Sequence, residues 1–328
     1  MSKTVGIIGA TGVVGREILS LLEIRKFPLQ TLRLFASAKS AGCVLGNRVI
    51  EPLTKEALQG IDLLFFCAGS TVSKEWIPRA LEQNAFVIDS SSAFRQDIDV
   101  PLIIPEINGH ILQKNHRLIA SPNCAATILL MPLFSLHREF KAKRIIVSTY
   151  QAASGAGQSL LTALQEETKA FLEEKPGSSL LPFPYAFNLY PHNSSLHSNG
   201  YVEEEIKIAQ ETRKILEDET IQLSATCVRV PVLRAHSLSA NVEFKHPFEL
   251  DAVYQLLEKV PGVRLFEERE ANRFATPRDA TGESDVFCGR FRKDPTQPNT
   301  LEFWAVGDQL LKGAALNAVQ IAEMLVQL

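Results

Sequence analysis

A glycine-rich turn near the start of the chain constrains its fold more than any other feature. Residues 9–15, with the sequence GATGVVG, follow an apolar run at Val5–Ile8 and open a helical pattern over Val13–Ile24. Glycines at this spacing let the backbone approach a pyrophosphate, and the amino end of the following helix favours its negative charge. Any tight turn needs glycine, so the motif alone is weak evidence. Its place between a strand and a helix predicts a dinucleotide-binding βαβ unit.

The first third of the chain alternates short apolar runs with helical patterns. We expect further strands at Leu32–Ala36, Leu63–Cys67, Phe86–Asp89 and Leu118–Ala120. Strands that alternate with helices are typical of a parallel sheet covered on both faces. The fold class predicted for this part is therefore α/β, a Rossmann-type parallel-sheet cofactor domain.

The pattern changes after Arg144, where longer alternating strands begin. The 328 residues also exceed the roughly 250–300 that one core usually supports, which indicates a second domain. We expect an α+β domain around a mixed sheet, followed by an amphipathic helix at Gln309–Leu328, with a surface loop at Pro176–Asn199. The strands expected in it are Ile145–Gln151, Ile221–Pro231, Ser237–Lys245 and Leu301–Val306, and the helices Ser159–Glu174, Val202–Asp218 and Leu250–Lys259.

Composition excludes several classes of protein. The net charge of −3 shows no basic excess, which argues against a nucleic-acid partner. No apolar run approaches the roughly 20 residues of a membrane span, and the glycines break the first apolar run too early for a signal peptide. The five cysteines are scattered without a CxxC pair, so neither a metal site nor a disulfide framework is expected. We therefore expect a cytoplasmic protein.

The end of the second expected strand indicates which dinucleotide binds. NAD enzymes usually carry an acidic residue there to hold the ribose 2′-hydroxyl. This chain instead has the sequence ASAKS, with Ser37, Lys39 and Ser40. Hydroxyl groups and a cation suit a 2′-phosphate, so we expect NADP. The alternative is an ordinary polar turn with a solvated lysine.

Cys124 is the candidate nucleophile. It lies in the sequence SPNCAAT between a strand and the apolar helical run Ile128–Leu136, which places it in the first turn of a helix. There the helix dipole favours the reactive thiolate. The alternative, a small buried cysteine, fits Cys67 and Cys227 better, because both lie inside apolar strands.

His236 is the candidate acid/base partner of the thiol. It follows the apolar run Thr226–Val232 in the sequence RVPVLRAHS. A histidine titrates near neutrality and can take and return a proton. The chain has seven histidines, and for any one of them a surface or core position is the commoner explanation.

Seven segments together resemble one known family. The chain is similar to aspartate-β-semialdehyde dehydrogenases from about Val5 to Ala322, with the order and spacing of all segments preserved. The matching segments are Gly9–Gly15, Ser37–Gly42, Ser121–Cys124, Ser148–Gly157, Glu204–Lys207, Arg229–His236 and Gly307–Leu316.

The resemblance implies NADPH-dependent reduction of L-aspartyl 4-phosphate to aspartate semialdehyde, with release of phosphate, in the synthesis of lysine, diaminopimelate, threonine and methionine. It implies that Cys124 forms a thioester, that His236 is the acid/base group and that Gln151 positions the acyl group. Substrate-binding residues implied by the match are Arg229 for the carboxylate, Glu204 for the amine, Lys207 and Arg95 for the phosphate, and Asn123. Cofactor-binding residues implied are Gly9, Thr11, Gly12, Val13, Val14, Gly15, Ser37, Lys39, Ser40, Ser154, Gly155 and Gln309.

The resemblance also implies the domain organisation. Residues 1–125 with 309–328 would form a discontinuous NADP-binding domain, and residues 126–308 the catalytic and dimerisation domain of a homodimer or homotetramer. Two departures from the family stand out. Position 43 is a cysteine where relatives often carry a basic residue, and the 176–199 region is short.

Three other functions are alternatives: an N-acetyl-γ-glutamyl-phosphate reductase, a glyceraldehyde-phosphate-type dehydrogenase and a non-catalytic relative. The second is disfavoured because its cysteine normally lies in the sequence SCTTN, which is absent here. N-acetyl-γ-glutamyl-phosphate reductases share the plan and the chemistry, but their acetylated amine needs no carboxylate such as Glu204. Without the resemblance, Glu204 and Lys207 would be taken for a surface ion pair three residues apart on one helix face. A non-catalytic nucleotide-binding relative would be expected to lose Cys124 or His236, and both are present.

Overall fold

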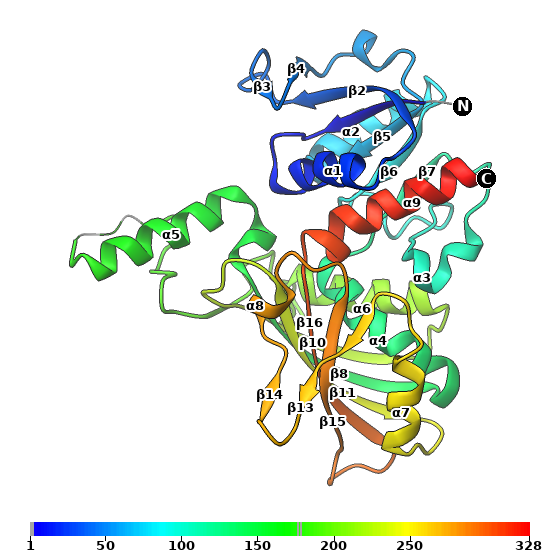
Figure 1. The fold of residues 1–328 in the computed structure, drawn as a ribbon, viewed down its shortest axis with the longest axis vertical. Helices are drawn as coiled ribbons and strands as arrows, with labels where there is room; N and C mark the ends of the chain where they lie inside the picture. Colours follow the sequence, from blue (N-terminus) through cyan, green and yellow to red (C-terminus); the bar gives the residue numbers. More distant parts are fainter. Residues whose placement is uncertain (1–2, 176, 178) are drawn as a thin grey trace. The chain divides into compact units, whose positions relative to one another are not determined.

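The computed structural model describes residues 3–175, 177 and 179–328 (Figure 1). The chain forms two compact units, one of Met1–Asn123 with Ala314–Leu328 and the other of Cys124–Gly313. The boundaries expected from the sequence lie at 125/126 and 308/309. In the described part of the chain, no helix combines the length and the apolar character that crossing a membrane requires.

The first unit is built on a sheet whose strands run in the order β3-β4-β2-β1-β5-β6-β7 (Figure 1). All neighbouring pairs are parallel except β3 with β4, which confirms the predicted parallel sheet. The central strands are apolar on both faces because helices cover them. The strands are β1 (Lys3–Ile8), β2 (Leu29–Ala36), β3 (Val44–Leu45), β4 (Arg48–Pro52), β5 (Leu63–Phe66), β6 (Phe86–Asp89) and β7 (Leu118–Ala120).

The C-terminal helix α9 (Leu316–Gln327) belongs to the first unit and packs on α1 (Val13–Ile24) and α3 (Pro105–Asn108). It starts later than the expected Gln309, because Leu311–Ala315 forms a π-helical turn after Asp308, whose Oδ1 accepts the N–H groups of residues 310 and 311. Asn317 Nδ2 donates to the Ile103 carbonyl at 2.9 Å. The unit also contains α2 (Ser70–Leu81), η1 (Glu56–Leu58) and η2 (Gly109–Ile111).

The second unit contains the predicted mixed sheet, in the order β12-β15-β16-β11-β8-β10-β9. β8 pairs in parallel with β10 and antiparallel with β11, so its neighbours run in opposite directions. The strands are β8 (Ala142–Gln151), β9 (Tyr190–Pro191), β10 (Gln222–Arg229), β11 (His236–Phe244), β12 (Val263–Leu265), β15 (Val286–Lys293) and β16 (Thr300–Gly307); β13 (Glu267–Glu268) and β14 (Arg273–Phe274) form a separate hairpin.

The helix α4 (Cys124–Phe140) packs along this sheet, against β8, β11, β15 and β16, and is almost wholly buried from Ala125 to Leu133. Its apolar character on all sides follows from that position. The other helical segments of the unit are η3 (Ala153–Ala156), α5 (Gln158–Leu172), α6 (Glu203–Leu216), α7 (Leu250–Leu257) and α8 (Pro277–Ala280).

Two sequence expectations for the second unit are corrected. The strand β15 was not predicted, because glycine and charged residues interrupt its alternation and its register shifts between Gly289 and Arg292. The expected surface loop at 176–199 is mostly exposed in its described part, but Tyr185 and Tyr190 within it are buried against Leu160 and Leu164, and Tyr190–Pro191 forms β9. Positions 176 and 178 of that loop lie outside the described residues.

Candidate active site

The glycine-rich turn between β1 and α1 is tightly packed. Gly9 has φ +89°, and a Cβ there would lie 2.8 Å from the Cys67 carbonyl oxygen. A Cβ on Gly15 would lie 2.3 Å from the Gly9 oxygen, so this position excludes any side chain. Gly12 caps α1, and its N–H donates to the Gly9 oxygen at 3.0 Å. The remaining turn residues, Thr11, Val13 and Val14, are partly exposed at the amino end of α1, where a phosphate would be favoured.

The turn after β2 has the polar character that the sequence indicated. Ser37 and Lys39 are exposed and Ser40 is partly exposed. The Ser40 N–H donates to the Ser37 carbonyl at 2.8 Å, which closes the turn. Cys43 follows it as an exposed free thiol. The positions therefore offer hydroxyl groups and one cation to a ligand, and no carboxylate.

Cys124 is the first residue of α4, as predicted, and it is partly exposed. The helix dipole favours negative charge at this position. Gly313 approaches it so closely that a Cβ there would lie 2.8 Å from the Cys124 Cβ. By contrast, burial raises the pKa of Cys67 and of Cys227 to about 12, so both thiols stay protonated. Cys227 is buried inside β10, as expected, whereas Cys67 follows the end of β5 and is partly exposed.

His236 begins β11 and is 1 % exposed. Its Nδ1 accepts the Ala152 N–H at 3.0 Å, so in the neutral ring the proton lies on Nε2. Nε2 has no hydrogen-bond partner in the part of the chain that the structure describes. Burial, and then the Arg229 guanidinium, lowers the pKa of His236 well below its usual value. The ring is therefore neutral near pH 7 and presents an unoccupied N–H.

Arg229 ends β10 and is 4 % exposed. Its Nη1 donates to the Ala152 carbonyl at 3.1 Å and its Nη2 to His192 Nε2 at 2.9 Å. Its Nε finds no partner among the described residues. A Cβ on Gly155 would lie 2.7 Å from His236 Cε1 and 3.0 Å from Arg229 Nη1, so the turn at 153–156 lies directly against both side chains.

Gln151 lies beside Arg229, because the two residues pair in register at the ends of β8 and β10. Its Nε2 donates to Glu204 Oε1 at 3.3 Å. Lys207, on the same helix as Glu204, forms an ion pair with Glu203 at 3.3 Å. The expected grouping of these polar residues is present, with Glu204 turned to Gln151 and Lys207 to Glu203.

The predicted site residues that remain form two further groups. In the second unit, Gln309 Nε2 donates to Ser154 Oγ, and Gln309 Oε1 accepts the Ala235 N–H at 2.8 Å. In the first unit, Arg95 is buried and donates to the carbonyls of Ser90 and Ser121, at 2.8 and 2.9 Å. Asn123, also buried, ends the segment that begins with Ser121.

His192 is a site residue that the sequence did not indicate. It lies in the region expected to be a loop, only 9 % of it is exposed, and it binds the predicted Arg229. Nothing in the sequence around it marks it, because its contact with Arg229 spans 37 positions of the chain.

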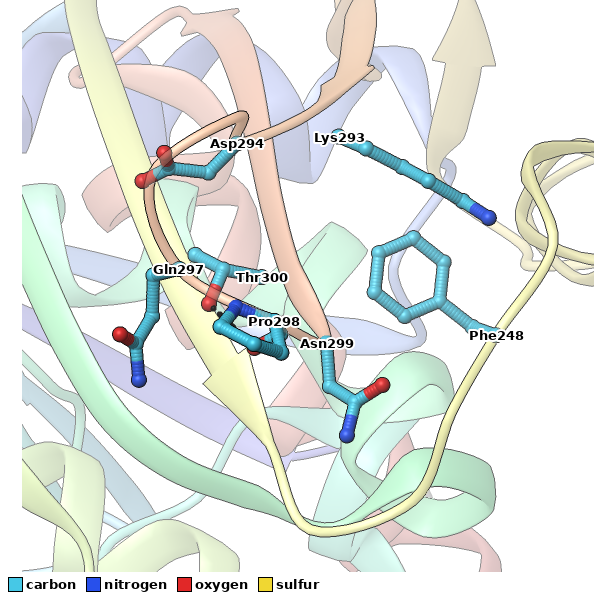
Figure 2. Close-up of a pocket in the computed structure, with 7 residues that line it drawn as sticks. All are labelled: Phe248, Lys293, Asp294, Gln297, Pro298, Asn299 and Thr300. Carbon is cyan, nitrogen blue, oxygen red and sulfur yellow. Dashed lines mark hydrogen bonds between the residues drawn. The ribbon is translucent and has the colours of Figure 1, made fainter.

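A pocket of about 130 Å³ lies elsewhere in the second unit, beside the turn between β15 and β16 (Figure 2). None of the predicted site residues lines it. Its two charged side chains are already engaged: Lys293 pairs with Glu249, and Asp294 accepts from Thr296 and Asn241. No cluster of metal-ligating side chains occurs among the described residues.

Comparison with known proteins gives consistent matches. A family model for the semialdehyde dehydrogenase NAD-binding domain matches residues 4–115, and one for the semialdehyde dehydrogenase dimerisation domain matches 133–312. Aspartate-semialdehyde dehydrogenase of Synechocystis sp. is 48 % identical over 98 % of this chain and 97 % of its own. The Prochlorococcus marinus enzyme of that name is 44 % identical over 98 % and 95 %.

The structural comparison agrees with these matches. Aspartate semialdehyde dehydrogenase II of Vibrio cholerae, solved as a complex with ASA, superposes with a TM-score of 0.94 at 36 % identity, covering 100 % of this chain and 99 % of that one. Both sequence and fold therefore lead to one assignment: this chain belongs to the aspartate-semialdehyde dehydrogenase family.

Proposed function

We propose that this enzyme reduces L-aspartyl 4-phosphate to L-aspartate 4-semialdehyde with NADPH, releases phosphate, and carries the acyl group as a thioester on Cys124. The observation that carries the proposal is a partly exposed cysteine at the first position of a buried helix, in a chain of this family. A thiolate there is a suitable nucleophile. The product supplies the aspartate-derived pathways to lysine, diaminopimelate, threonine and methionine.

We propose a route through a thioester that starts from the Cys124 thiolate. The Cys124 thiolate attacks the acyl carbon, an S–C bond forms, and the C–O bond to phosphate breaks with its electron pair leaving on phosphate. NADPH supplies the hydride that reduces the thioester carbon. The resulting tetrahedral oxyanion re-forms the C=O bond and expels the thiolate, which frees the aldehyde. His236 would be the acid/base group, and its Nε2–H, unpaired among the described residues, would donate a hydrogen bond to the oxyanion.

We propose that the polar groups of the candidate site recognise the substrate. The Arg229 guanidinium, with its unpaired Nε, would bind the carboxylate, and Glu204 the ammonium group. Lys207 and Arg95 would bind the phosphate, and Gln151 and Asn123 the acyl group. Glu204 favours a free amine over an acetylated one, which argues against the N-acetylglutamyl substrate.

The reverse reaction tests the proposal directly. We expect purified protein to form NADPH from aspartate semialdehyde, phosphate and NADP, and Cys124→Ala to abolish this signal while NADPH binding persists. Cys43→Ala, which removes another accessible thiol, is the matched control and should keep full activity. Loss of NADPH binding in Cys124→Ala would show a structural cysteine instead. A folded wild-type protein that binds NADPH but gives no signal would move the assignment to the N-acetylglutamyl substrate, and then to a non-catalytic relative.

We propose NADP as the preferred cofactor, since Ser37, Lys39 and Ser40 offer hydroxyls and a cation at the end of β2. Lys39→Ala should raise the KM for NADP by about tenfold, the order of one hydrogen bond to a charged group, and leave the KM for NAD unchanged. Lys114→Ala removes an exposed lysine from a loop of the same unit and should change neither. Equal effects of Lys39→Ala on both cofactors would contradict a role at the 2′-phosphate.

We propose that the protein is a homodimer or homotetramer whose subunits associate through the second unit, the region matched by the dimerisation-domain model. Light scattering would measure this, and a monomer at micromolar concentration would contradict it. The five free cysteines fit a reducing compartment, so we propose the cytoplasm as the site of action.

A further inference from the structure

His192 lies against Arg229 inside the second unit. Its backbone is fixed by the sheet: β9 pairs with the end of β10, where Tyr190 is the partner of Arg229, and the His192 N–H donates to the Cys227 carbonyl at 2.8 Å. The imidazole Nε2 lies 2.9 Å from Arg229 Nη2, and both side chains are buried. The histidine is therefore held in place before any ligand arrives.

The contact fixes the protonation of the imidazole. Arginine can only donate, so Nε2 of His192 must accept and the ring proton lies on Nδ1. Nδ1 then donates to Ser194 Oγ at 3.1 Å, and this oxygen also accepts the Glu204 N–H at 3.1 Å. The Ser194 N–H also points to Nδ1, at 3.2 Å. A neutral imidazole has a single acceptor nitrogen, and the closer, charged Arg229 donor decides which one it is. Burial, and then the Arg229 charge, lowers the pKa of His192 to about 4, so the ring is neutral near pH 7.

Arg229 is thus held at two of its three nitrogens. Nη1 is bound to the Ala152 carbonyl and Nη2 to His192, while Nε is buried and unpaired among the described residues. A buried unpaired donor costs free energy, which a carboxylate ligand would recover. Through Ser194, the same histidine is connected to the first turn of the helix that carries Glu204.

We propose that His192 is a positioning residue for substrate recognition. As a neutral hydrogen-bond acceptor it holds the Arg229 guanidinium in place, and through Ser194 it connects Arg229 to the backbone of Glu204. The groups for the carboxylate and the amine of an α-amino acid substrate therefore keep one relative placement. This inference rests on the proposed function, because it takes Arg229 and Glu204 as the substrate-binding groups.

Replacement of His192 can distinguish a positioning role, which affects the KM for the substrate, from a structural role, which also affects kcat and the affinity for NADP. His192→Ala should raise the KM for aspartate semialdehyde by about 10- to 100-fold, the order expected for a lost hydrogen bond to a charged group, with kcat and the KM for NADP within about threefold of wild type. His192→Gln can place an amide oxygen where Nε2 lies and should restore most of the affinity. A glutamine variant as weak as alanine, or an alanine variant that loses kcat and NADP affinity equally, would overturn the proposal.

A double-mutant cycle with Arg229→Lys tests whether His192 acts through Arg229. Lysine keeps the charge but has no fork for His192 to orient. In that background His192→Ala should change the KM by less than about threefold, because coupled residues are not additive. Full additivity of the two substitutions would overturn the proposal.

The protonation state gives a measurement that does not depend on activity. With ¹⁵N-labelled histidine, and with His192→Gln used to assign the signal, the His192 ring should show a protonated Nδ1 and an unprotonated Nε2 at pH 7. An Nε2–H form would overturn the inference even in an active enzyme. A wild-type protein that shows the expected tautomer but turns over no aspartate semialdehyde would instead contradict the proposed function.

Discussion

At the residue scale, the buried arginine and the two buried histidines of the candidate site differ in charge. Arg229 keeps its charge because guanidinium is protonated at any accessible pH. His236 and His192, which lie beside it, are driven neutral by burial and by that charge, which lowers the pKa of each. Among the three neighbouring side chains Arg229, His192 and His236, the positive charge is therefore held by Arg229, and the two histidines remain neutral hydrogen-bonding groups.

His236 is the residue for which the chemistry gives the sharpest prediction. His236→Ala should lower kcat by about 10²–10⁴-fold, the usual range for one acid/base group, because it removes the proposed acid/base group and its Nε2–H, which is unpaired among the described residues. Steady-state assays of the reverse reaction would measure this. The exposed His197, which pairs with Glu203, provides the control, and His197→Ala should stay close to wild type. A near-normal kcat for His236→Ala would contradict the assignment.

At the scale of elements, the candidate site is an edge where neighbouring strands of one sheet begin or end. β8 and β10 run in parallel and finish together at Gln151 and Arg229, while β11, antiparallel to β8, starts at the same edge with His236. The turn at 153–156 then crosses this edge and packs on two of the three side chains. Strand direction therefore brings together side chains that are far apart in the sequence.

Gly155 allows the turn at 153–156 to pack against His236 and Arg229, and its replacement tests how close this contact is. A Cβ at this position would approach His236 and Arg229 to within 3.0 Å, so Gly155→Ala should displace both. We expect a kcat at least tenfold lower together with a raised KM for aspartate semialdehyde, since small misplacements cost catalysis heavily. Ala156→Ser changes an exposed neighbour in the same turn and serves as control. Wild-type kinetics for Gly155→Ala would contradict the close contact.

At the scale of the whole molecule, the buried neutral histidines couple folding to pH. The pKa values of His137, His192 and His236 are lowered in the folded chain, chiefly by burial. Below the unfolded value of about 6.5 the unfolded chain binds protons that the folded chain does not, so stability falls as the pH falls. Each such histidine contributes at most about 1.4 kcal/mol per pH unit, and for His192 this continues down to about pH 4.

Thermal unfolding between pH 7.5 and 5 would measure this coupling. The midpoint should fall on acidification, and less steeply in His192→Gln, because the variant lacks one of the groups that titrate only when unfolded. Most carboxylates titrate near pH 4 and contribute little in this window. Identical pH dependence in the two proteins would show that His192 is already protonated in the folded chain.

The sequence by itself determined the features that depend on neighbouring residues. The turn at 9–15 predicted the first βαβ unit because glycine spacing and an adjacent strand and helix are local properties. Cys124 was placed correctly at the start of a helix because a proline and an asparagine precede an apolar helical run. The seven matched segments identified the family, and with it the expected site residues, because their order in the chain is preserved.

Tertiary structure decided what depends on partners distant along the chain. The sequence around His192 resembles a loop, yet sheet pairing with β10 and a contact 37 positions away bury it against Arg229. Likewise β15 is a strand despite its interrupted pattern, because β12 and β16 supply its hydrogen bonds from either side. The neutral state of His236 also depends on the tertiary structure, because burial and the neighbouring Arg229 charge, on another strand, lower its pKa. The spacing of residues along the chain determines which helix or strand forms. Which side chains are buried, which strands pair and which charges lie beside each group is determined only when the tertiary structure forms.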